Sequence, residues 1–244
     1  KSSRKNAVAT WGQKVVEDQV NGFVITIDGA AGTGKSSVAH ELANRLGTEC
    51  LDTGAMYRAA AVLSIDFNVN PNDGAALAAA IREKEIRFDW NQSPPVILLG
   101  GVDISQRVRD LDVSSVVSIV AQQPEVRQVL VEQQRAICML HPLLVTEGRD
   151  QGSVVFPDAI VRFYLEAEVE ERTRRRVKQL RDSGTSVNDE DIQRDIQSRD
   201  KLDSTRLDGP LICPNGAIKI NTSALSKTEV VDLMESEVTS RLQE

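Results

Sequence analysis

A glycine-rich run that ends in lysine and serine has the residue types and spacing to do chemistry. Residues 29–36 read GAAGTGKS and fit G-x-x-x-x-G-K-[ST], the phosphate-binding P-loop. Its glycines allow successive backbone N–H groups to surround phosphate oxygens, Lys35 adds positive charge, and the Ser36 hydroxyl is placed to bind Mg²⁺. The motif predicts a nucleoside triphosphate site, with ATP bound by Gly29, Ala30, Ala31, Gly32, Thr33, Gly34, Lys35, Ser36 and Ser37.

The residues around this loop supply the elements that must position it. The apolar run 23–27 predicts a strand, and apolar residues at helical spacing over 36–46 predict a helix that ends at Gly47. The positive end of the helix dipole then points at the phosphates. A dinucleotide-binding loop is the weaker interpretation, because no G-x-G-x-x-G occurs.

The composition predicts a soluble, cytoplasmic protein. The 244 residues are 41% hydrophobic and 27% charged, and no apolar run approaches the ~20 residues needed to cross a membrane. Cys50, Cys138 and Cys213 lack the spacing of a disulfide framework or a zinc site. We expect both histidines, His40 and His141, to be structural.

The charge distribution predicts a small anionic ligand. A formal net charge of -7 argues against binding to a nucleic-acid polymer. The positive charges are nevertheless concentrated in one quarter of the chain. They are Arg149, Arg172, Arg174, Arg175, Arg176, Lys178, Arg181, Arg199, Lys201 and Arg206.

Predicted strands alternate with predicted helices along the chain. This order favours an α/β fold, a P-loop NTPase-type parallel sheet flanked by helices, with the active site at the carboxyl ends of the strands. Short predicted strands at 85–89, 96–99 and 102–104 indicate a small antiparallel insertion. A capping box at 226–229 predicts a final helix, and residues 1–21 carry only a weak helical pattern.

Two predicted helices carry charges that could meet a ligand. Arg199, Asp203 and Arg206 are spaced to share one face, which fits either a ligand site or a solvated salt-bridge face. The helix at 168–181 is rich in arginine and has only a thin apolar stripe. It is predicted to be a weakly docked lid over bound phosphates, and an exposed helix is the alternative.

These motifs together resemble bacterial cytidylate kinases. The resemblance rests on the P-loop, DTGAMYR at 52–58, GRDQGSVVFPDA at 148–159, the arginine-rich lid and RDKLDSTR at 199–206, all in family order. It implies a core at 22–72 and 110–244, with the lid at about 168–188. It also implies a nucleoside monophosphate (NMP)-binding domain inserted at 73–109, and residues 1–21 are expected to form an N-terminal arm.

The resemblance also implies residue roles. Arg58, Arg149 and Arg206 would hold the monophosphate, Ser118, Arg127 and Asp150 would face cytosine, and Arg199 and Asp203 would hold the sugar. The full CMP-binding set is Thr53, Tyr57, Arg58, Arg109, Ser118, Arg127, Arg149, Asp150, Arg199, Asp203 and Arg206. The catalytic set is Lys35, Arg149, Arg172, Arg175 and Arg176.

The implied reaction transfers the γ-phosphoryl group of ATP to CMP or dCMP. Mg²⁺ would be held by Ser36, with Glu147 contributing through water, and the family is expected to be monomeric. Leu202, Gln151 and Glu147 depart from the usual family residues. Two rival interpretations are a kinase for another nucleotide or small metabolite, and a nucleotide-binding switch.

Overall fold

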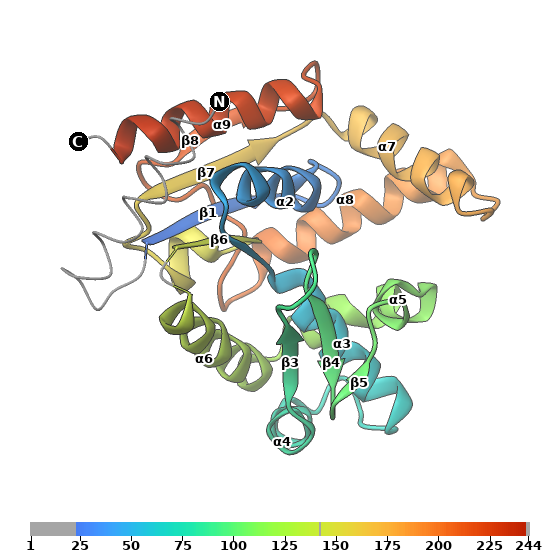
Figure 1. Cartoon of the computed structure of the whole chain (residues 1–244). Helices are drawn as coiled ribbons and strands as arrows, with labels where there is room; N and C mark the ends of the chain where they lie inside the picture. Colours follow the sequence, from blue (N-terminus) through green and yellow to red (C-terminus); the bar gives the residue numbers. More distant parts are fainter. Residues whose placement is uncertain (1–22, 142, 243–244) are drawn as a thin grey trace.

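Five parallel strands form the sheet on which the rest of the chain is built (Figure 1). The computed structural model describes residues 23–141 and 143–242, so the predicted arm at 1–21 lies outside the described residues. The strands run in the order β2-β6-β1-β7-β8. They are β1 (Phe23–Gly29), β2 (Glu49–Asp52), β6 (Leu143–Gly148), β7 (Val161–Glu166) and β8 (Ile218–Asn221). All neighbours pair in parallel, which confirms the predicted α/β class.

Both faces of the sheet are covered, as the apolar strands require. Successive side chains of β1 point to opposite faces, so Val24 joins one hydrophobic cluster and Ile25 joins the other. The cluster around Ile25 packs against α2 (Lys35–Leu46) and α9 (Lys227–Arg241). The cluster around Val24 packs against α3 (Thr53–Asp66) and α6 (Pro124–Leu140).

Helix α2 ends, and helix α9 begins, at the capping residues that the sequence predicts. Gly47 ends α2 in the left-handed conformation, with φ of 67°, and its N–H donates to the carbonyl oxygens of Ala43 and Asn44. Ser226 and Glu229 form the predicted capping box at the start of α9. These local signals were sufficient to predict both ends.

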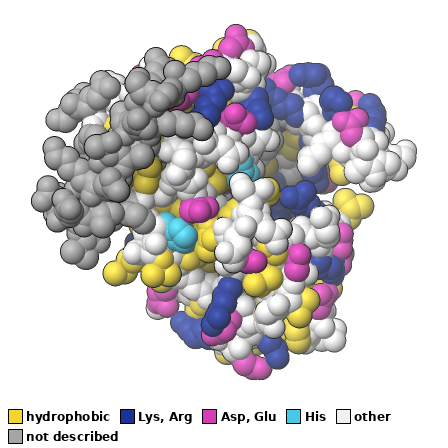
Figure 2. All heavy atoms as spheres, viewed as in Figure 1, with side chains coloured by type: hydrophobic (Ala, Val, Ile, Leu, Met, Phe, Trp, Pro, Cys, Tyr) yellow, Lys and Arg dark blue, Asp and Glu magenta, His cyan; other side chains and the backbone are white. Residues whose placement is uncertain are grey.

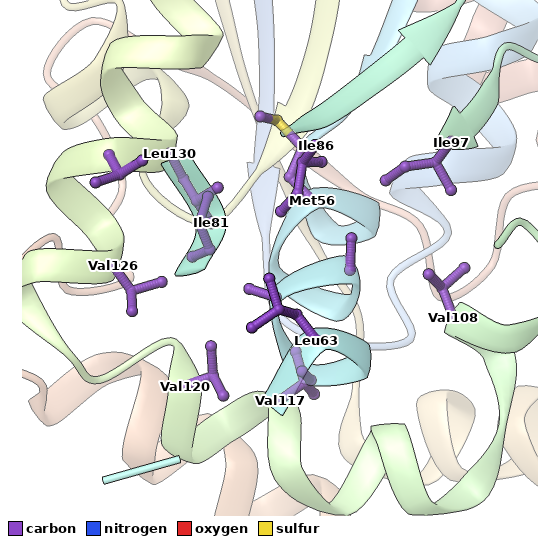
Figure 3. Close-up of a cluster of buried hydrophobic side chains, with 14 of the residues drawn as sticks. Met56, Leu63, Ile81, Ile86, Ile97, Val108, Val117, Val120, Val126 and Leu130 are labelled. Atoms are coloured by element: carbon purple, nitrogen blue, oxygen red, sulfur yellow. The ribbon is translucent and has the colours of Figure 1, made fainter. Parts of the chain in front are cut away.

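A second, antiparallel sheet contains the three predicted short strands (Figure 1). It consists of β3 (Ile86–Asp89), β4 (Val96–Leu99) and β5 (Val102–Asp103), preceded by α4 (Gly74–Lys84) and followed by α5 (Leu111–Val120). Ile81, Ile86 and Ile97 pack with Met56 and Leu63 of α3 in one cluster (Figure 3). The antiparallel sheet therefore packs in the same hydrophobic cluster as the helices beneath the main sheet.

Two charged helices project from the carboxyl edge of the sheet, α7 (Val169–Asp182) and α8 (Asp189–Thr205) (Figure 1). Val177 and Leu180 of α7 are buried, but neither belongs to the two described clusters that cover the sheet. None of the helices in the described ranges combines the length and apolar character that a membrane span requires.

Candidate active site

The predicted phosphate loop connects β1 to α2, which is the context the motif requires. Gly34 precedes α2 with φ of 95°, a conformation that favours glycine. A Cβ at Gly29 would overlap the backbone carbonyl of Leu165 on β7. The Thr33 hydroxyl donates to the carbonyl oxygen of Ala30 over 3.0 Å and closes the loop.

Lys35 lies buried beneath this loop. Its Nζ donates to the carbonyl oxygen of Ala30 over 2.7 Å. Burial and the neighbouring Arg149 lower the pKa of Lys35, while Glu147 and Asp203 oppose that shift. An anion brought to this point would therefore stabilise the charged ammonium.

Ser36, the last residue of the P-loop motif, contacts Glu147 on β6. The Ser36 hydroxyl donates to Oε1 of Glu147 over 2.6 Å. Burial raises the pKa of the Glu147 carboxyl, and Asp52, its register neighbour on β2, adds to the increase. The pairing of β1, β2 and β6 thus places the Glu147 carboxylate beside the hydroxyl of the P-loop serine.

These two residues fit a magnesium ion. In proteins Mg²⁺ commonly keeps several waters and is bound through one or two carboxylates plus substrate phosphates. Among the described residues, no group of three or more His, Cys, Asp or Glu side chains could hold a metal alone. A hydroxyl and a carboxylate side by side next to a phosphate loop match the more open arrangement.

Asp28, directly before the P-loop, was not predicted to act in the site. Its carboxylate accepts hydrogen bonds from the N–H groups of Gln151 (2.8 Å) and Gly152 (2.7 Å). Burial raises the pKa of Asp28 to about 6. The contacts attach the π-helical turn Gln151–Val155, which sequence reasoning did not predict, to the end of β1.

Three arginines gather around the buried carboxylate of Asp203. Arg149 Nε lies 2.9 Å from Asp203 Oδ2, and Arg206 Nη1 lies 3.9 Å from Oδ1. Arg199 is close enough to lower the pKa of Asp203 together with the other two. Burial and Arg149 in turn lower the pKa of Arg199 to about 10. Arg206 follows the last residue of α8, so the predicted shared face forms although its third member lies beyond the helix.

Arg58 adds a further cation to this region. Its Nη1 donates to the carbonyl oxygen of Val108 (3.2 Å) and to Oγ of Ser114 (3.0 Å). Burial lowers the pKa of Arg58, and the positive charges of Arg176 and Arg149 contribute to the decrease. Figure 2 shows Lys and Arg side chains in the recess between the α7–α8 end and the α3–α5 side. The cationic excess there would be relieved by a bound anion.

Arg127 and Asp150 form a buried ion pair between Arg127 Nη2 and Asp150 Oδ2. Arg127 is only 1% exposed, and its Nη1 donates to the hydroxyl of Tyr57 over 3.2 Å. Arg206 Nη2 lies 3.9 Å from the same Asp150 oxygen. The structure therefore joins the predicted base-facing pair to the arginine cluster.

Two arginines of the predicted lid contact the P-loop backbone. Arg172 donates to the carbonyl oxygen of Ala31 over 3.2 Å and pairs with Asp200 on α8 at 2.7 Å. Arg175 donates to the carbonyl oxygens of Thr33 (3.4 Å) and Thr222 (2.6 Å). The sequence predicted weak docking from the thin apolar stripe. The first half of α7 also makes guanidinium contacts, which periodicity does not reveal, and the lid remains a prediction.

Other predicted residues lie apart from this cluster or use their polar groups on the protein. The Thr53 hydroxyl donates to the carbonyl oxygen of Glu147 over 2.7 Å. Arg176 donates to Gln179 over 2.8 Å. Arg109 is exposed in a 3-10 turn, and Ser118 lies on α5 with its carbonyl accepting from Gln122. Their predicted substrate contacts remain predictions.

The three departures from the family pattern have distinct environments. Gln151 is buried, where its Oε1 accepts from the Thr146 hydroxyl (2.8 Å) and its Nε2 donates to Gln134 (3.1 Å). Leu202 is exposed on α8. Glu147 makes the contact with Ser36 described above. An amide thus fits position 151 because polar partners surround it.

Comparison with known proteins agrees with this arrangement. Residues 25–240 match the family model described as cytidylate kinase. The cytidylate kinase of Caldanaerobacter subterraneus subsp. tengcongensis is 43% identical over 208 residues, covering 85% of this chain and 91% of that protein. The one from Nocardia farcinica is 43% identical over 210 residues, covering 86% and 90%. The one from Haemophilus ducreyi is 38% identical over 213 residues, covering 87% and 94%. The chain belongs to the cytidylate kinase family.

Proposed function

We propose that this chain transfers the γ-phosphoryl group of ATP to CMP or dCMP, giving ADP and CDP or dCDP. The proposal rests on the proximity of two cationic regions: Ser36 of the P-loop donates to Glu147 over 2.6 Å, and Arg149 of the arginine cluster lies two residues after Glu147. Arg149 of the arginine cluster around Asp203 is close enough to Lys35 of the P-loop to lower the pKa of that lysine. A donor phosphate on the loop and an acceptor phosphate on the cluster would therefore meet at this point.

The donor side supplies binding and charge. Loop N–H groups and the start of α2 would face the ATP phosphates, and Lys35, whose Nζ donates to the carbonyl oxygen of Ala30 in the loop over 2.7 Å, would add positive charge there. Arg172 and Arg175 approach the loop from α7 and would stabilise negative charge on the transferred group. Ser36 and Glu147 would hold Mg²⁺, which when bound neutralises charge on the phosphates.

The acceptor side needs no general base. The attacking atom is a phosphate oxygen, which is already a competent nucleophile, so catalysis consists of positioning and charge neutralisation. Arg58, Arg149 and Arg206 are proposed to hold the monophosphate, and Arg199 and Asp203 the sugar. In the same proposal, residues 73–109 form the acceptor-binding insertion, and residues 168–188 form a lid that excludes water.

Hydrogen-bond polarity supports a cytosine base. Cytosine presents an amino donor at N4 and an acceptor at N3, whereas uracil presents an acceptor at O4 and a donor at N3. Asp150 can accept from the amino group, and Arg127 can donate to N3, so uracil reverses both contacts. A site built to bond one polarity rejects the other strongly, because its buried groups are left without partners.

The test is an ATP-consumption assay across nucleoside monophosphates with Mg²⁺ present. CMP and dCMP should be good acceptors, UMP much poorer, and AMP and GMP excluded by size. Lys35→Met is the catalytic control, and Lys227→Met, on the exposed start of α9, is the matched control that should retain full turnover. Equal ATP consumption with and without acceptor would favour a switch. Preference for another acceptor would favour a different kinase.

A further inference from the structure

The segment after α8 turns back onto the Arg127–Asp150 ion pair. Arg206 Nε donates to the carbonyl oxygen of Gly209 over 2.5 Å, which closes the turn. The N–H of Leu211 donates to the carbonyl oxygen of Asp203 over 2.7 Å, which ties the turn to α8. Residues 206–211 are thus fixed at both ends beside the predicted base-recognition groups.

Gly209 allows this close approach. It has a φ of +57°, and a Cβ there would overlap both Arg127 Nη2 and Asp150 Oδ2. At Gly209 the turn therefore contacts the ion pair through backbone atoms, with no side chain in between. As a result, the preceding residue, Asp208, lies near the Nε atom of the same guanidinium.

Asp208 places a second carboxylate on Arg127. Asp208 Oδ2 lies 3.3 Å from Arg127 Nε, and the Asp208 side chain is 46% exposed. Among the described residues, the Nε atom of Arg127 has no hydrogen-bond partner. The contact with Asp208 is therefore an attraction between charges, not a directed hydrogen bond.

The hydrogen bonds of Arg127 indicate what its attraction to Asp208 contributes. Nη1 donates one hydrogen to Tyr57, and Nη2 donates one to Asp150. Each Nη carries two hydrogens, so each keeps one for another acceptor. A buried guanidinium that lost its only carboxylate would be costly. With Asp208 at Nε, Arg127 can share Asp150 with an incoming base and keep a compensating charge.

We propose that Asp208 is a specificity-determining positioning residue. Its carboxylate holds the Arg127 guanidinium in the orientation in which Arg127 and Asp150 meet the acceptor base, and Gly209 lets the turn come close enough. The inference rests on the proposed function, since it concerns how the acceptor base is selected.

The experiment compares Asp208→Asn, Asp208→Ala and Asp208→Glu in steady-state kinetics with CMP and with UMP. Loss of the charge should raise KM for CMP by about two- to fivefold, the size of a partly exposed ion pair. The kcat and the KM for ATP should stay within about twofold of wild type, because Asp208 acts at the base and not at the phosphates.

Two further readouts separate positioning from a structural role. Asp208→Asn should behave like Asp208→Ala, and Asp208→Glu should recover part of the CMP affinity, because charge is the active property. The ratio of CMP to UMP in kcat/KM should fall in both uncharged variants. The KM difference from wild type should shrink at high salt, which screens an exposed carboxylate.

The matched control is Asp232→Asn on α9. Asp232 pairs with Arg45 at 2.5 Å and is 60% exposed. The substitution therefore removes a comparable ion pair far from the base-recognition pair. Its kinetics should equal those of wild type. Unchanged CMP affinity and unchanged CMP-to-UMP ratio in Asp208→Asn would overturn the inference, as would misfolding of both uncharged variants. Wild-type protein that fails to phosphorylate CMP would contradict the proposed function instead.

Discussion

Ser36 and Glu147 meet at the boundary between helix and sheet, where the Ser36 hydroxyl donates to the Glu147 carboxylate over 2.6 Å. Ser36 belongs to the first turn of α2, and Glu147 to the last residues of β6. The pairing of β6 with β1 brings them together, since Ile27 and Glu147 are register partners. The sheet topology therefore assembles the proposed magnesium site.

Glu147→Gln should weaken the use of magnesium. The amide oxygen still accepts from Ser36, but the negative charge is lost. We expect activity or metal affinity to fall by roughly 10- to 100-fold, as for residues that support a metal. The measurement is ATP turnover with CMP over a Mg²⁺ titration, with Glu41→Gln on the outer face of α2 as control. An unchanged Mg²⁺ requirement would exclude Glu147 from the site.

Asp28 should make stability depend on pH. Burial raises the pKa of Asp28 from 3.8 to about 6, so between these values the folded protein holds a proton that the unfolded chain has released. The stabilising contribution is complete below pH 3.8 and is lost as the pH rises through about 6.

The difference in unfolding free energy between wild type and Asp28→Asn isolates this effect. Going from pH 4 to pH 6, wild type should lose stability relative to the variant by on the order of 2 kcal/mol, because this range covers most of a shift worth ~1.4 kcal/mol per pKa unit. Urea unfolding at several pH values measures it. A difference that stays constant over this range would show that Asp28 keeps an ordinary pKa.

Much of the fold followed from local sequence signals. The P-loop sits between a strand and a helix, and Gly47 and Ser226 define helix ends, because each acts on groups within a few residues. The π-helical turn Gln151–Val155 was missed because it depends on Asp28, a partner distant in sequence that accepts from its N–H groups.

The site was predictable as a set of residues but not as a set of contacts. Arg127 and Asp150 were both expected to face the base, and their pairing with each other depends on how α6 meets the end of β6. The contact of Asp208 with Arg127 had no sequence signal, because a single aspartate in a turn is typical of loops.

Asp150→Asn should relax base discrimination. The asparagine amide can donate to uracil O4, and its oxygen can still accept from the cytosine amino group. Two correct base contacts at ~1 to 3 kcal/mol each predict on the order of a thousandfold preference for CMP over UMP in wild type. The variant should lose at least about tenfold of this ratio in kcat/KM, because a neutral amide binds the cytosine amino group less strongly than a carboxylate does and gains a contact with uracil O4.

Thermal denaturation must accompany these kinetics, because the carboxylate belongs to a buried ion pair with Arg127. A folded Asp150→Asn protein with full discrimination would show that the base is selected elsewhere.

The segment 168–188 should become protected when both nucleotides bind. Val177 and Leu180 of α7 are buried but lie outside the two described sheet clusters, and Arg172 and Arg175 donate to the P-loop backbone. Bound phosphates would add contacts to those arginines. Amide hydrogen exchange with ATP analogue and CMP together should slow in 168–188 and stay constant in α9. Equal exchange in both states would contradict a lid.

The fate of the γ-phosphorus of ATP distinguishes phosphoryl transfer to CMP from hydrolysis of ATP. ATP labelled at the γ position is incubated with the protein, Mg²⁺ and CMP, and the labelled products are separated. The label should appear in the β-phosphate of CDP, and Lys35→Met should abolish this transfer in a protein that remains folded. Label released as inorganic phosphate at the same rate with and without CMP would contradict transfer to CMP.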